Sequence, residues 1–348
     1  MPRRSPAALI VVLSVGAGLG ACGGHDDAST TASSATVSTP SGQVKTVDLR
    51  KAGAKEVSLD GDWLVATKDA VWITAGREVD RLDPQTAEQT GDVSVPGGPC
   101  LGGAYAFGAI FMPTCYSTKG LVRVDPETQR VTDQIRVPTS GLYNEEGSIA
   151  AGEGAVWMVL DGQGCEACVL VGFDPKTLSM THQIELEPGA ASVAVGGGFV
   201  WVSDSQRNRV LRIDPRTNDV VGETEVGGLP QYLVVDSNGV WVLNQLEGTV
   251  MQLDPHTGQL IKTIEADMKG AGGSITVGAG SVWVRGTLTL LKQIDSQTGE
   301  IVAQYGPEGG SGDALVSDGV LWVSAFRPGH GTGPGSGIVY RLPLSQIR

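Results

Sequence analysis

The sequence predicts an all-β fold, a seven-bladed β-propeller built from four-stranded antiparallel blades. Two observations carry this prediction. A short strand with a central Trp or Phe recurs roughly every 40 residues, and a turn of the form Asp-Pro-x-Thr follows most of these strands in phase. Propeller blades are four-stranded sheets of about 40–50 residues, so seven such units fit one closed ring.

The clearest unit begins at Ser192. Its segments Ser192–Val195, Phe199–Val202, Arg209–Ile213 and Val220–Val226 are rich in β-branched and aromatic residues, which favour strands over helices. A glycine-rich turn separates the first two segments, and an Asp-Pro turn separates the last two. The unit therefore has four strands.

The Asp-Pro-x-Thr motif predicts a tight turn. The Asp side chain can accept hydrogen bonds from backbone N–H groups two residues on, and Pro presets φ for the next position of the turn. We expect this turn wherever the motif occurs, with the proline missing from the last example: Asp83–Thr86, Asp125–Thr128, Asp174–Thr177, Asp214–Thr217, Asp254–Thr257 and Asp295–Thr298.

The aromatic strand carries Trp in six units and Phe in one. We expect these rings to fill the wedges between neighbouring blades, because the strands that carry them are apolar on both faces. The seven strands are Ala70–Ile73, Gly108–Met112, Ala155–Met158, Phe199–Val202, Gly239–Val242, Ser281–Val284 and Val320–Val323.

The two ends of the repeat region predict how the ring closes. The last unit finishes with Gly337–Leu342, which is only its third strand, whereas Val44–Leu49 precedes the first unit and belongs to no other. We therefore expect residues 44–49 to pair beside Val339 as the outer strand of the last blade. Closure of this kind leaves only short outer edges unpaired.

The first 21 residues are typical of a secretory signal peptide. An arginine pair supplies positive charge, and the apolar run Ala7–Val15 is too short to span a membrane. Leu19-Gly20-Ala21-Cys22 resembles a bacterial lipobox, which implies cleavage before Cys22 and acylation of that residue, for example with palmitate. An ordinary signal peptide with an incidental cysteine is the alternative, and export by the Sec or the twin-arginine route stays open.

Residues 22–43 are predicted to form a flexible tether. They are mostly Ser, Thr, Ala and Gly, and they contain too few apolar residues to offset the entropy of ordering. The expected domains are a lipoprotein signal peptide at 1–21, the lipidated cysteine and tether at 22–43, and the propeller at 44–348. The expected location is the bacterial cell membrane, with the protein held by its lipid and facing the extracytoplasmic side.

A Val-Trp-Val strand followed by Leu-x-x-Ile-Asp-Pro-x-Thr resembles the repeat of YVTN/YncE-type seven-bladed propellers, and more distantly that of streptogramin B (virginiamycin B) lyase-like propellers. The resemblance covers about residues 44–342. It implies the fold, but proteins of this fold have many functions. The lyase-like relatives depend on a His and Glu pair with a divalent ion. No pair here matches residue by residue, so we carry over no catalytic residue and expect no cofactor and no metal.

The charge of the chain argues against two classes of partner. The formal net charge is −13. Nucleic-acid binding rests on Lys and Arg meeting phosphates, so no nucleic acid is expected as a partner. The negative charge also disfavours contact of the propeller itself with an anionic lipid surface, which leaves the N-terminal lipid as the expected membrane contact.

Four cysteines remain in the propeller, where export favours oxidation. Cys100 and Cys115 flank the aromatic strand of the second unit on loops that share one face, so a disulfide between them is geometrically reasonable. Cys165 and Cys168 lie in a single loop, where a local disulfide is favoured over a redox or zinc motif. The sequence does not decide among the three possible pairings of four cysteines.

One face of the predicted ring is the default binding site. The loops between second and third strands and those between units emerge on this face, and they are long and varied, whereas the opposite face carries the repeated Asp-Pro turns. The candidate ligand-binding residues on the varied loops are Tyr116, Tyr143, Asn144, Glu145, Asp204, Arg207, Tyr232, Asn244, Arg285, Phe326, Arg327 and His330. Each of these taken singly also fits a solvated loop residue.

Two functions remain. The favoured one is a monomeric, membrane-tethered propeller that binds a small polar ligand or another exported protein through the varied face. The alternative is a lyase or hydrolase that uses carboxylates near the central channel and a divalent ion. Convergent carboxylates with an ion-sized gap at the channel mouth would favour catalysis, and a wide, shallow, mixed face would favour binding.

Overall fold

Residues Ser34–Arg348 form one compact unit. The structure, a computed structural model, describes residues 35–38, 44–100, 102–115, 119–137, 148–160, 168–270, 272–306, 310, 312–327 and 335–347. No helix within these ranges is long and apolar enough to cross a membrane.

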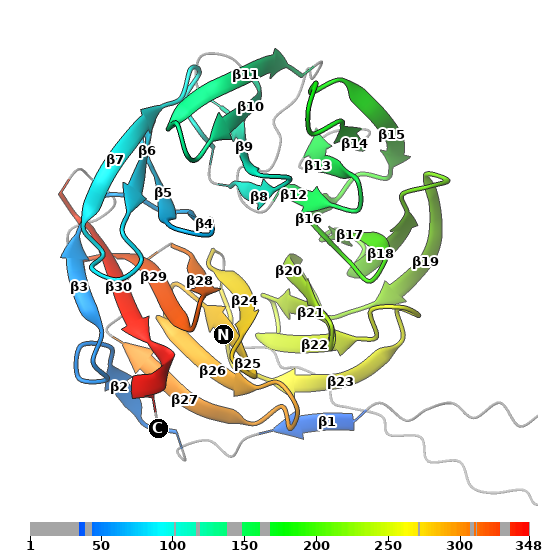
Figure 1. Cartoon of the computed structure of the whole chain (residues 1–348). Helices are drawn as coiled ribbons and strands as arrows, with labels where there is room; N and C mark the ends of the chain where they lie inside the picture. Colours follow the sequence, from blue (N-terminus) through cyan, green and yellow to red (C-terminus); the bar gives the residue numbers. More distant parts are fainter. Residues whose placement is uncertain are drawn as a thin grey trace, which may run out of the picture. The chain divides into compact units, whose positions relative to one another are not determined.

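The unit is a ring of seven antiparallel sheets, as the repeat predicts (Figure 1). Each blade has four antiparallel strands, which follow one another from the axis to the rim, and two of the sheets carry a fifth strand on the rim. Blades 1 to 3 consist of β4 (Leu64–Ala66), β5 (Val71–Ala75), β6 (Glu78–Leu82) and β7 (Gln89–Ser94); β8 (Ala104–Ala106), β9 (Ala109–Thr114), β10 (Gly120–Asp125) and β11 (Arg130–Arg136); and β12 (Ile149–Gly152), β13 (Ala155–Leu160), β14 (Cys168–Phe173) and β15 (Met180–Leu186).

The remaining four blades repeat this order. Blades 4 and 5 consist of β16 (Ala190–Gly196), β17 (Phe199–Asp204), β18 (Arg209–Asp214) and β19 (Asp219–Glu225); and β20 (Pro230–Asp236), β21 (Gly239–Asn244), β22 (Thr249–Leu253) and β23 (Leu260–Glu265). Blades 6 and 7 consist of β24 (Ser274–Gly278), β25 (Ser281–Arg285), β26 (Leu291–Asp295) and β27 (Ile301–Gly306); and β28 (Ala314–Ser317), β29 (Val320–Phe326), β30 (Gly337–Pro343) and β3 (Lys55–Ser58). A short 3-10 helix, Leu344–Gln346, follows β30.

An N-terminal strand closes the ring in the last blade, but the predicted residues are corrected. The closing strand is β3, which pairs antiparallel with β30 and places Val57 opposite Val339. The segment expected there, residues 44–49, instead contains β2 (Thr46–Asp48), which runs parallel to β27 on the rim of blade 6. The chain therefore crosses the rim of blade 6 before it enters blade 7.

A further strand lies within the segment predicted to be a flexible tether. β1 (Ala35–Ser38) pairs in parallel with β23 on the rim of blade 5, and Val37 stands opposite Ile264. An outer strand offers an unpaired row of backbone N–H and C=O groups, which four residues of almost any composition can satisfy in extended form. The tether prediction is therefore wrong for these four residues, and the rest of residues 22–43 lies outside the described ranges.

The aromatic rings fill the wedges between blades, as expected. All six Trp residues of the second strands, and Phe111 in blade 2, are at most 1% exposed. Each ring packs against the next blade in the ring. Trp201, for example, shares a cluster with Leu233 and Val240 of blade 5.

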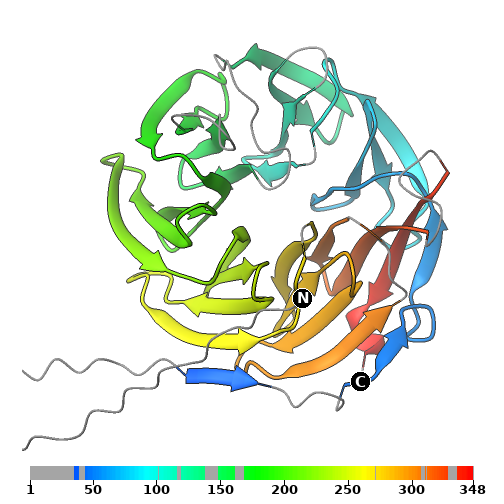
Figure 2. The same ribbon diagram turned by 180° about the vertical axis from the view of Figure 1, so that it is seen from behind.

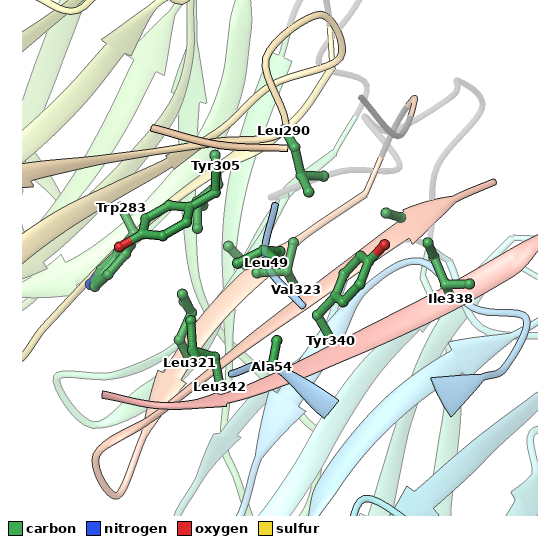
Figure 3. Close-up of a cluster of buried hydrophobic side chains, with 13 residues drawn as sticks. Leu49, Ala54, Trp283, Leu290, Tyr305, Leu321, Val323, Ile338, Tyr340 and Leu342 are labelled. Atoms are coloured by element: carbon green, nitrogen blue, oxygen red, sulfur yellow. The ribbon is translucent and has the colours of Figure 1, made fainter. Parts of the chain in front are cut away.

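Figure 3 shows the wedge between blades 6 and 7. Trp283 lies beside Tyr305, with ring centroids 6.3 Å apart, and both pack with Leu321 and Leu342 of blade 7. Leu49, which follows β2, is fully buried in the same cluster. The N-terminal segment therefore contributes to the core as well as to the rim.

The Asp turns form as their chemistry predicts. In five of the six turns the Asp Oδ1 accepts hydrogen bonds from two backbone N–H groups, as Asp254 does from His256 at 2.9 Å and Thr257 at 2.7 Å. In the sixth, Asp214 Oδ1 accepts one backbone N–H group, that of Arg216, at 2.9 Å. The turn that lacks proline behaves alike, since Asp295 accepts from Gln297 and Thr298 at 2.9 and 2.7 Å. The Asp carboxylate rather than the proline is therefore the common element.

Candidate functional site

The two faces of the ring differ as expected. The connections from second to third strand and from blade to blade lie on one side, which we call the loop-rich face. The turns between first and second strands and the Asp turns lie on the other, which we call the turn face. The inner strands β4, β8, β12, β16, β20, β24 and β28 surround the axis, and Figures 1 and 2 show them from the two sides.

A small cavity of about 120 Å³ lies where the inner strands begin, at the mouth of the central channel on the loop-rich face. All seven blades contribute to it. Its lining residues are Trp63, Gly102, Gly103, Ile149, Ser192, Val193, Tyr232, Leu233, Ser274, Ile275 and Asp313.

Two aromatic rings meet in this mouth. The centroids of Trp63 and Tyr232 are 6.5 Å apart with an interplanar angle of 35°. Trp63 precedes the inner strand of blade 1, and Tyr232 belongs to the inner strand of blade 5, so the contact crosses the axis rather than joining neighbouring blades. The pair therefore narrows the loop-rich end of the channel.

Hydroxyl groups hold the starts of several inner strands. The backbone N–H of Trp63 donates to Thr74 Oγ1 at 3.1 Å, and that of Asp313 donates to Ser324 Oγ at 2.8 Å. Thr74 and Ser324 each lie two residues after the wedge Trp of their blade. In blade 6 the same position is Arg285, which is 0% exposed. A guanidinium thus replaces the hydroxyl beside the mouth.

Arg285 and Asp313 form the charged side of the mouth. The Arg285 Nε–H donates to the Ser324 carbonyl at 3.2 Å. Asp313 accepts from the backbone N–H of Leu64 at 3.0 Å and from its neighbour Ala314 at 2.7 Å. Burial raises the pKa of Asp313 to about 7 and lowers the pKa of Arg285 to about 10.

Nearby carboxylates also act on both pKa values. Asp62 and Asp313 both favour the charged form of Arg285, although burial outweighs them. The negative charge of Asp62 also adds to the rise in the pKa of Asp313. The mouth therefore combines an aromatic pair, a buried cation and a carboxyl that titrates near neutral pH, a combination that is common at binding and catalytic sites.

Only two of the candidate residues come together at this mouth. Tyr232 lines the cavity, and Arg285 lies buried beside it. The other described candidates lie apart. Tyr116, Tyr143, Asn144, Glu145 and His330 lie outside the described residues, as does the predicted lipidation residue Cys22.

Asp204 and Arg207 belong to an ion-pair network at the edge of blade 4. Asp204 Oδ2 lies 3.0 Å from Arg209 Nε and 3.5 Å from Arg207 Nη1, and Arg207 Nε lies 3.2 Å from Glu187. Asp204 also accepts the backbone N–H groups of Gln206 and Arg207, at 3.2 and 3.0 Å. These contacts give the pair a structural role in the loop.

The other three candidates are also held by local contacts. Asn244 is fully buried and its amide donates to Thr249 Oγ1 at 3.0 Å. Phe326 ends β29, and Arg327 follows it with its guanidinium bonded to Ser58 and 3.9 Å from Glu56. The structure therefore does not assemble the predicted set into one site.

The mouth contains residues that the sequence analysis missed, namely Trp63, Ser274 and Asp313. One signal was present for Trp63. It is the one Trp of the seven in the sequence that does not fall on a wedge strand. Ser274 and Asp313 carry no comparable signal, because each is a single polar residue at the start of a short strand.

The disulfide between Cys100 and Cys115 is confirmed. It ties the loop that enters blade 2 to the end of β9. Cys168 begins β14 and is buried, and Cys165 lies outside the described residues, so the pairing of Cys165 with Cys168 stays a prediction.

Exposed leucines mark another part of the loop-rich face. Leu246 and Leu288 are 67% and 68% exposed at the loop tips of blades 5 and 6, and Leu229 is 39% exposed where the chain enters blade 5. Hydrogen bonds join the Leu246 loop to the segment before Leu229 and to the linker between blades 5 and 6. The Leu246 N–H donates to the Gly228 carbonyl at 3.1 Å, and the Gly270 N–H donates to the Gln245 carbonyl at 3.2 Å.

Within the described residues, no group of three or more His, Cys, Asp or Glu side chains is placed to hold a metal ion. Of the carboxylates that would have to converge for the lyase or hydrolase alternative, Asp313 is the one that lines the mouth. The geometry therefore adds no support to that alternative.

The seven blades and the closure of their ring by the pairing of β3 with β30 show that the chain is a seven-bladed β-propeller. No protein-family model matches the sequence, and no curated protein matches it. Among solved structures, BamB from Moraxella catarrhalis is similar, with a TM-score of 0.55 over 81% of this chain and 84% of that chain. The sequence identity is 11%, so this likeness supports the fold alone.

Proposed function

We propose that this propeller is a binding scaffold that docks another exported protein through the loops of blades 5 and 6. The observation that carries the proposal is the run of exposed leucines formed by Leu229, Leu246 and Leu288, which we call the leucine tract. Scattered exposed leucines are ordinary on a protein surface. Exposed leucines at neighbouring loop tips on one face, in contrast, are typical of a protein-binding surface.

The support beneath the tract favours binding without rearrangement. Its loops leave blades whose wedges are closed by Trp241 and Trp283, which are at most 1% exposed. Lys292 extends from β26 to the carbonyl of Ala266 at 2.8 Å and fixes the connection between the two blades. A rigid surface loses little conformational entropy on binding, so a modest apolar area suffices for specific docking.

The partner that fits is a protein with an apolar segment. Leucine side chains offer no hydrogen bonds, so they recognise complementary apolar groups rather than a small polar ligand. The exposed Glu247 and Lys269 lie on the loops beside the leucines and supply a polar rim. The second candidate function is binding of a small polar ligand at the channel mouth. The aromatic pair of Trp63 and Tyr232, together with the buried Arg285, favours it.

The location is part of the proposal. The arginine pair, the apolar run and the lipobox-like segment ending at Cys22 support export and lipid anchoring at the extracytoplasmic side of a bacterial membrane. The repeat motif supports membership of the YVTN/YncE-type propellers. Mass spectrometry of the mature chain tests the anchor. Lipid anchoring predicts an acylated Cys22 at the N-terminus, and an unmodified N-terminus at any other residue contradicts it.

Site-specific photo-crosslinking tests the docking surface. A photoreactive amino acid at Leu246 or Leu288, introduced in the producing cells, is expected to join the protein to one defined partner. The same probe at Val221, which is 43% exposed on the outer strand β19, is the matched control and is expected to give no such product. Equal crosslinking at all three positions would overturn the proposal.

Purified components then test the affinity. Leu246→Asp and Leu288→Asp together are expected to weaken binding of the crosslinked partner at least tenfold, since each buries a charge in an apolar contact. Val221→Asp is expected to leave it unchanged. Unchanged affinity of the double variant would place the partner elsewhere and contradict the proposal.

A further inference from the structure

The indole N–H groups of the wedge Trp residues follow a rule with one exception. In five blades this N–H donates to an acceptor five residues earlier, at the end of the inner strand. The acceptors are Thr67 Oγ1 at 3.2 Å, the carbonyls of Gly152 at 3.1 Å, Gly196 at 3.0 Å and Gly278 at 3.3 Å, and Asp236 Oδ1 at 3.1 Å. In blade 7 the Trp322 Nε1–H is buried and has no acceptor among the described residues.

The residue five positions before Trp322 is Ser317, which ends β28. By the rule of the other blades, the Trp322 N–H is directed toward this end of the inner strand. Trp322 and Ser317 both line a cavity of about 300 Å³ that lies on the turn face between blades 7 and 1. The donor left unsatisfied by the protein therefore belongs to a side chain of the cavity wall.

The cavity offers two further donors. Lys68 lies on its rim in the turn after β4, and its ammonium makes no hydrogen bond or ion pair within the part of the chain that the structure describes. Arg341 lines the same cavity and uses its Nε–H on the Pro84 carbonyl at 2.7 Å. Asp318, exposed at the rim, is the acidic residue of the lining.

We propose that this cavity binds a small molecule through a carboxylate group, with the Trp322 N–H, Lys68 and Arg341 as donors. A carboxylate accepts several hydrogen bonds at once, and those from cations are the strongest. Two cations against one acid give the lining a positive charge on a protein of net charge −13. Val71, Val320 and the Trp322 ring supply an apolar wall for the body of such a ligand. This site is independent of the leucine tract, which lies on the opposite face.

A comparison with other blades argues that the arrangement is specific. The cavity between blades 3 and 4 on the same face is lined by Glu153, His182 and Arg216. No wedge Trp lines it, and the Trp157 N–H behind it is bonded to the Gly152 carbonyl. Six blades have a wedge Trp, and in five of them its indole N–H has an acceptor. Within the described residues, blade 7 is thus the one in which the indole N–H lacks an acceptor, and its Trp lines a cavity.

The indole N–H resonances of the ¹⁵N-labelled full chain report on the site directly. Sodium benzoate is the probe, because it carries one carboxylate on a flat apolar body. It is expected to shift the Trp322 resonance saturably, while the Trp241 resonance, whose N–H is bonded to Asp236, stays in place as an internal control. Benzamide has the same shape without the charge and is expected to bind at least tenfold more weakly.

Two variants separate the carboxylate site from a general solvent effect. Ser317→Asp places a carboxylate where blade 5 has Asp236, so it is expected to occupy the Trp322 N–H and abolish the response to benzoate. Lys68→Gln is expected to weaken benzoate about tenfold while the wedge stays folded. The Trp322 resonance is identified as the one that Ser317→Asp moves.

Three results would overturn the proposal. A Trp322 resonance that benzoate does not shift shows that the donor is satisfied within the protein, for example by rotation of the Ser317 hydroxyl. An equal shift in the Ser317→Asp variant places the benzoate elsewhere. Equal affinity for benzoate and benzamide removes the carboxylate from the recognition.

Discussion

The Trp63 indole lies 6.5 Å from the phenol ring of Tyr232 across the axis of the propeller. Blades 1 and 5 are not neighbours, so this contact does not belong to any wedge between blades. Trp63 also packs against the cluster that contains Trp72 and Ile110, while Tyr232 packs with Trp241 and Ile275. The pair links two distant parts of the ring at the mouth of the channel.

A double-mutant cycle should measure this link. Trp63→Leu and Tyr232→Leu are each expected to destabilise the protein, and together by less than the sum, with a coupling energy of about 0.5–1.5 kcal/mol. Urea unfolding monitored by circular dichroism gives the four free energies. Strict additivity would show that the two rings do not interact in solution.

Removal of a wedge ring should have a larger effect. Trp201→Ala is expected to lower the free energy of unfolding by ~3–5 kcal/mol, because the ring is 0% exposed between blades 4 and 5 and leaves a void when it is removed. Leu246→Ala is the control, since a mostly exposed leucine is expected to change stability by less than ~0.5 kcal/mol. Similar losses for the two variants would contradict the wedge assignment.

The carboxyl of Asp313 should make stability depend on pH near neutrality. Its pKa is raised by burial to about 7, from 3.8, so the folded state holds a proton that the unfolded state releases between these values. Its contribution to stability is therefore complete below pH 4 and is lost as the pH rises to about 7, by ~1.4 kcal/mol per pH unit.

Asp313→Asn replaces the protonated carboxyl by a neutral group of the same shape. Comparison of urea unfolding at pH 5 and pH 8 is expected to show a smaller difference in the variant than in the parent. Asp80 provides a second pH-dependent group, since burial raises its pKa to about 6, and its own Asn variant serves as a reference. An unchanged pH profile in Asp313→Asn would show that Asp313 stays ionised in the fold.

The Asp turns should act in the opposite direction at lower pH. Backbone hydrogen bonds lower the pKa of Asp254, first from Thr257 and then from His256. The stability contributed by this carboxylate is present above its unfolded pKa of 3.8 and is lost as the pH falls below it. Asp254→Asn keeps an acceptor oxygen without a charge, so it is expected to lose less stability between pH 4 and pH 2 than the parent. Thermal unfolding across that range is the measurement.

The Cys100–Cys115 disulfide should stabilise the entry to blade 2. The two residues are 15 apart in the sequence. A bond that closes a loop of this length lowers the entropy of the unfolded chain and so raises the free energy of unfolding by about 3 kcal/mol. Cys100→Ser with Cys115→Ser is expected to lower stability by roughly that amount. Peptide mapping without reductant checks the bond itself, and its absence in protein from an oxidising compartment would contradict the assignment.

The sequence predicted the fold because its signals are local and repeated. The Val-Trp-Val strands and the Asp-Pro-x-Thr turns specify secondary structure within a few residues, and their phase specifies the number of blades. The prediction went wrong at the chain ends. Residues 35–38 carry no strong strand pattern, and they form a strand because β23 presents an unpaired edge to them. Residues 46–48 form the expected strand, but they pair with the unpaired edge of β27 in blade 6 instead of with blade 7.

The candidate site was predicted less well for the same physical reason. Tyr232 and Arg285 were found, because large polar residues near the ends of predicted strands stand out in a sequence. Asp204 and Asn244 stood out as strongly, yet ion pairs and a buried amide contact hold them in structural roles. Trp63 and Asp313 meet the other residues of the mouth only when the ring has closed.

The sequence by itself thus determined the seven sheets, their wedges and the chemistry of their turns, since each depends on neighbours within one repeat. The tertiary structure alone decided which residues share the channel mouth, which outer edges the N-terminal segment covers, and which indole N–H lacks an acceptor. These features depend on contacts between residues far apart in the chain, and no local pattern of side chains encodes such distances.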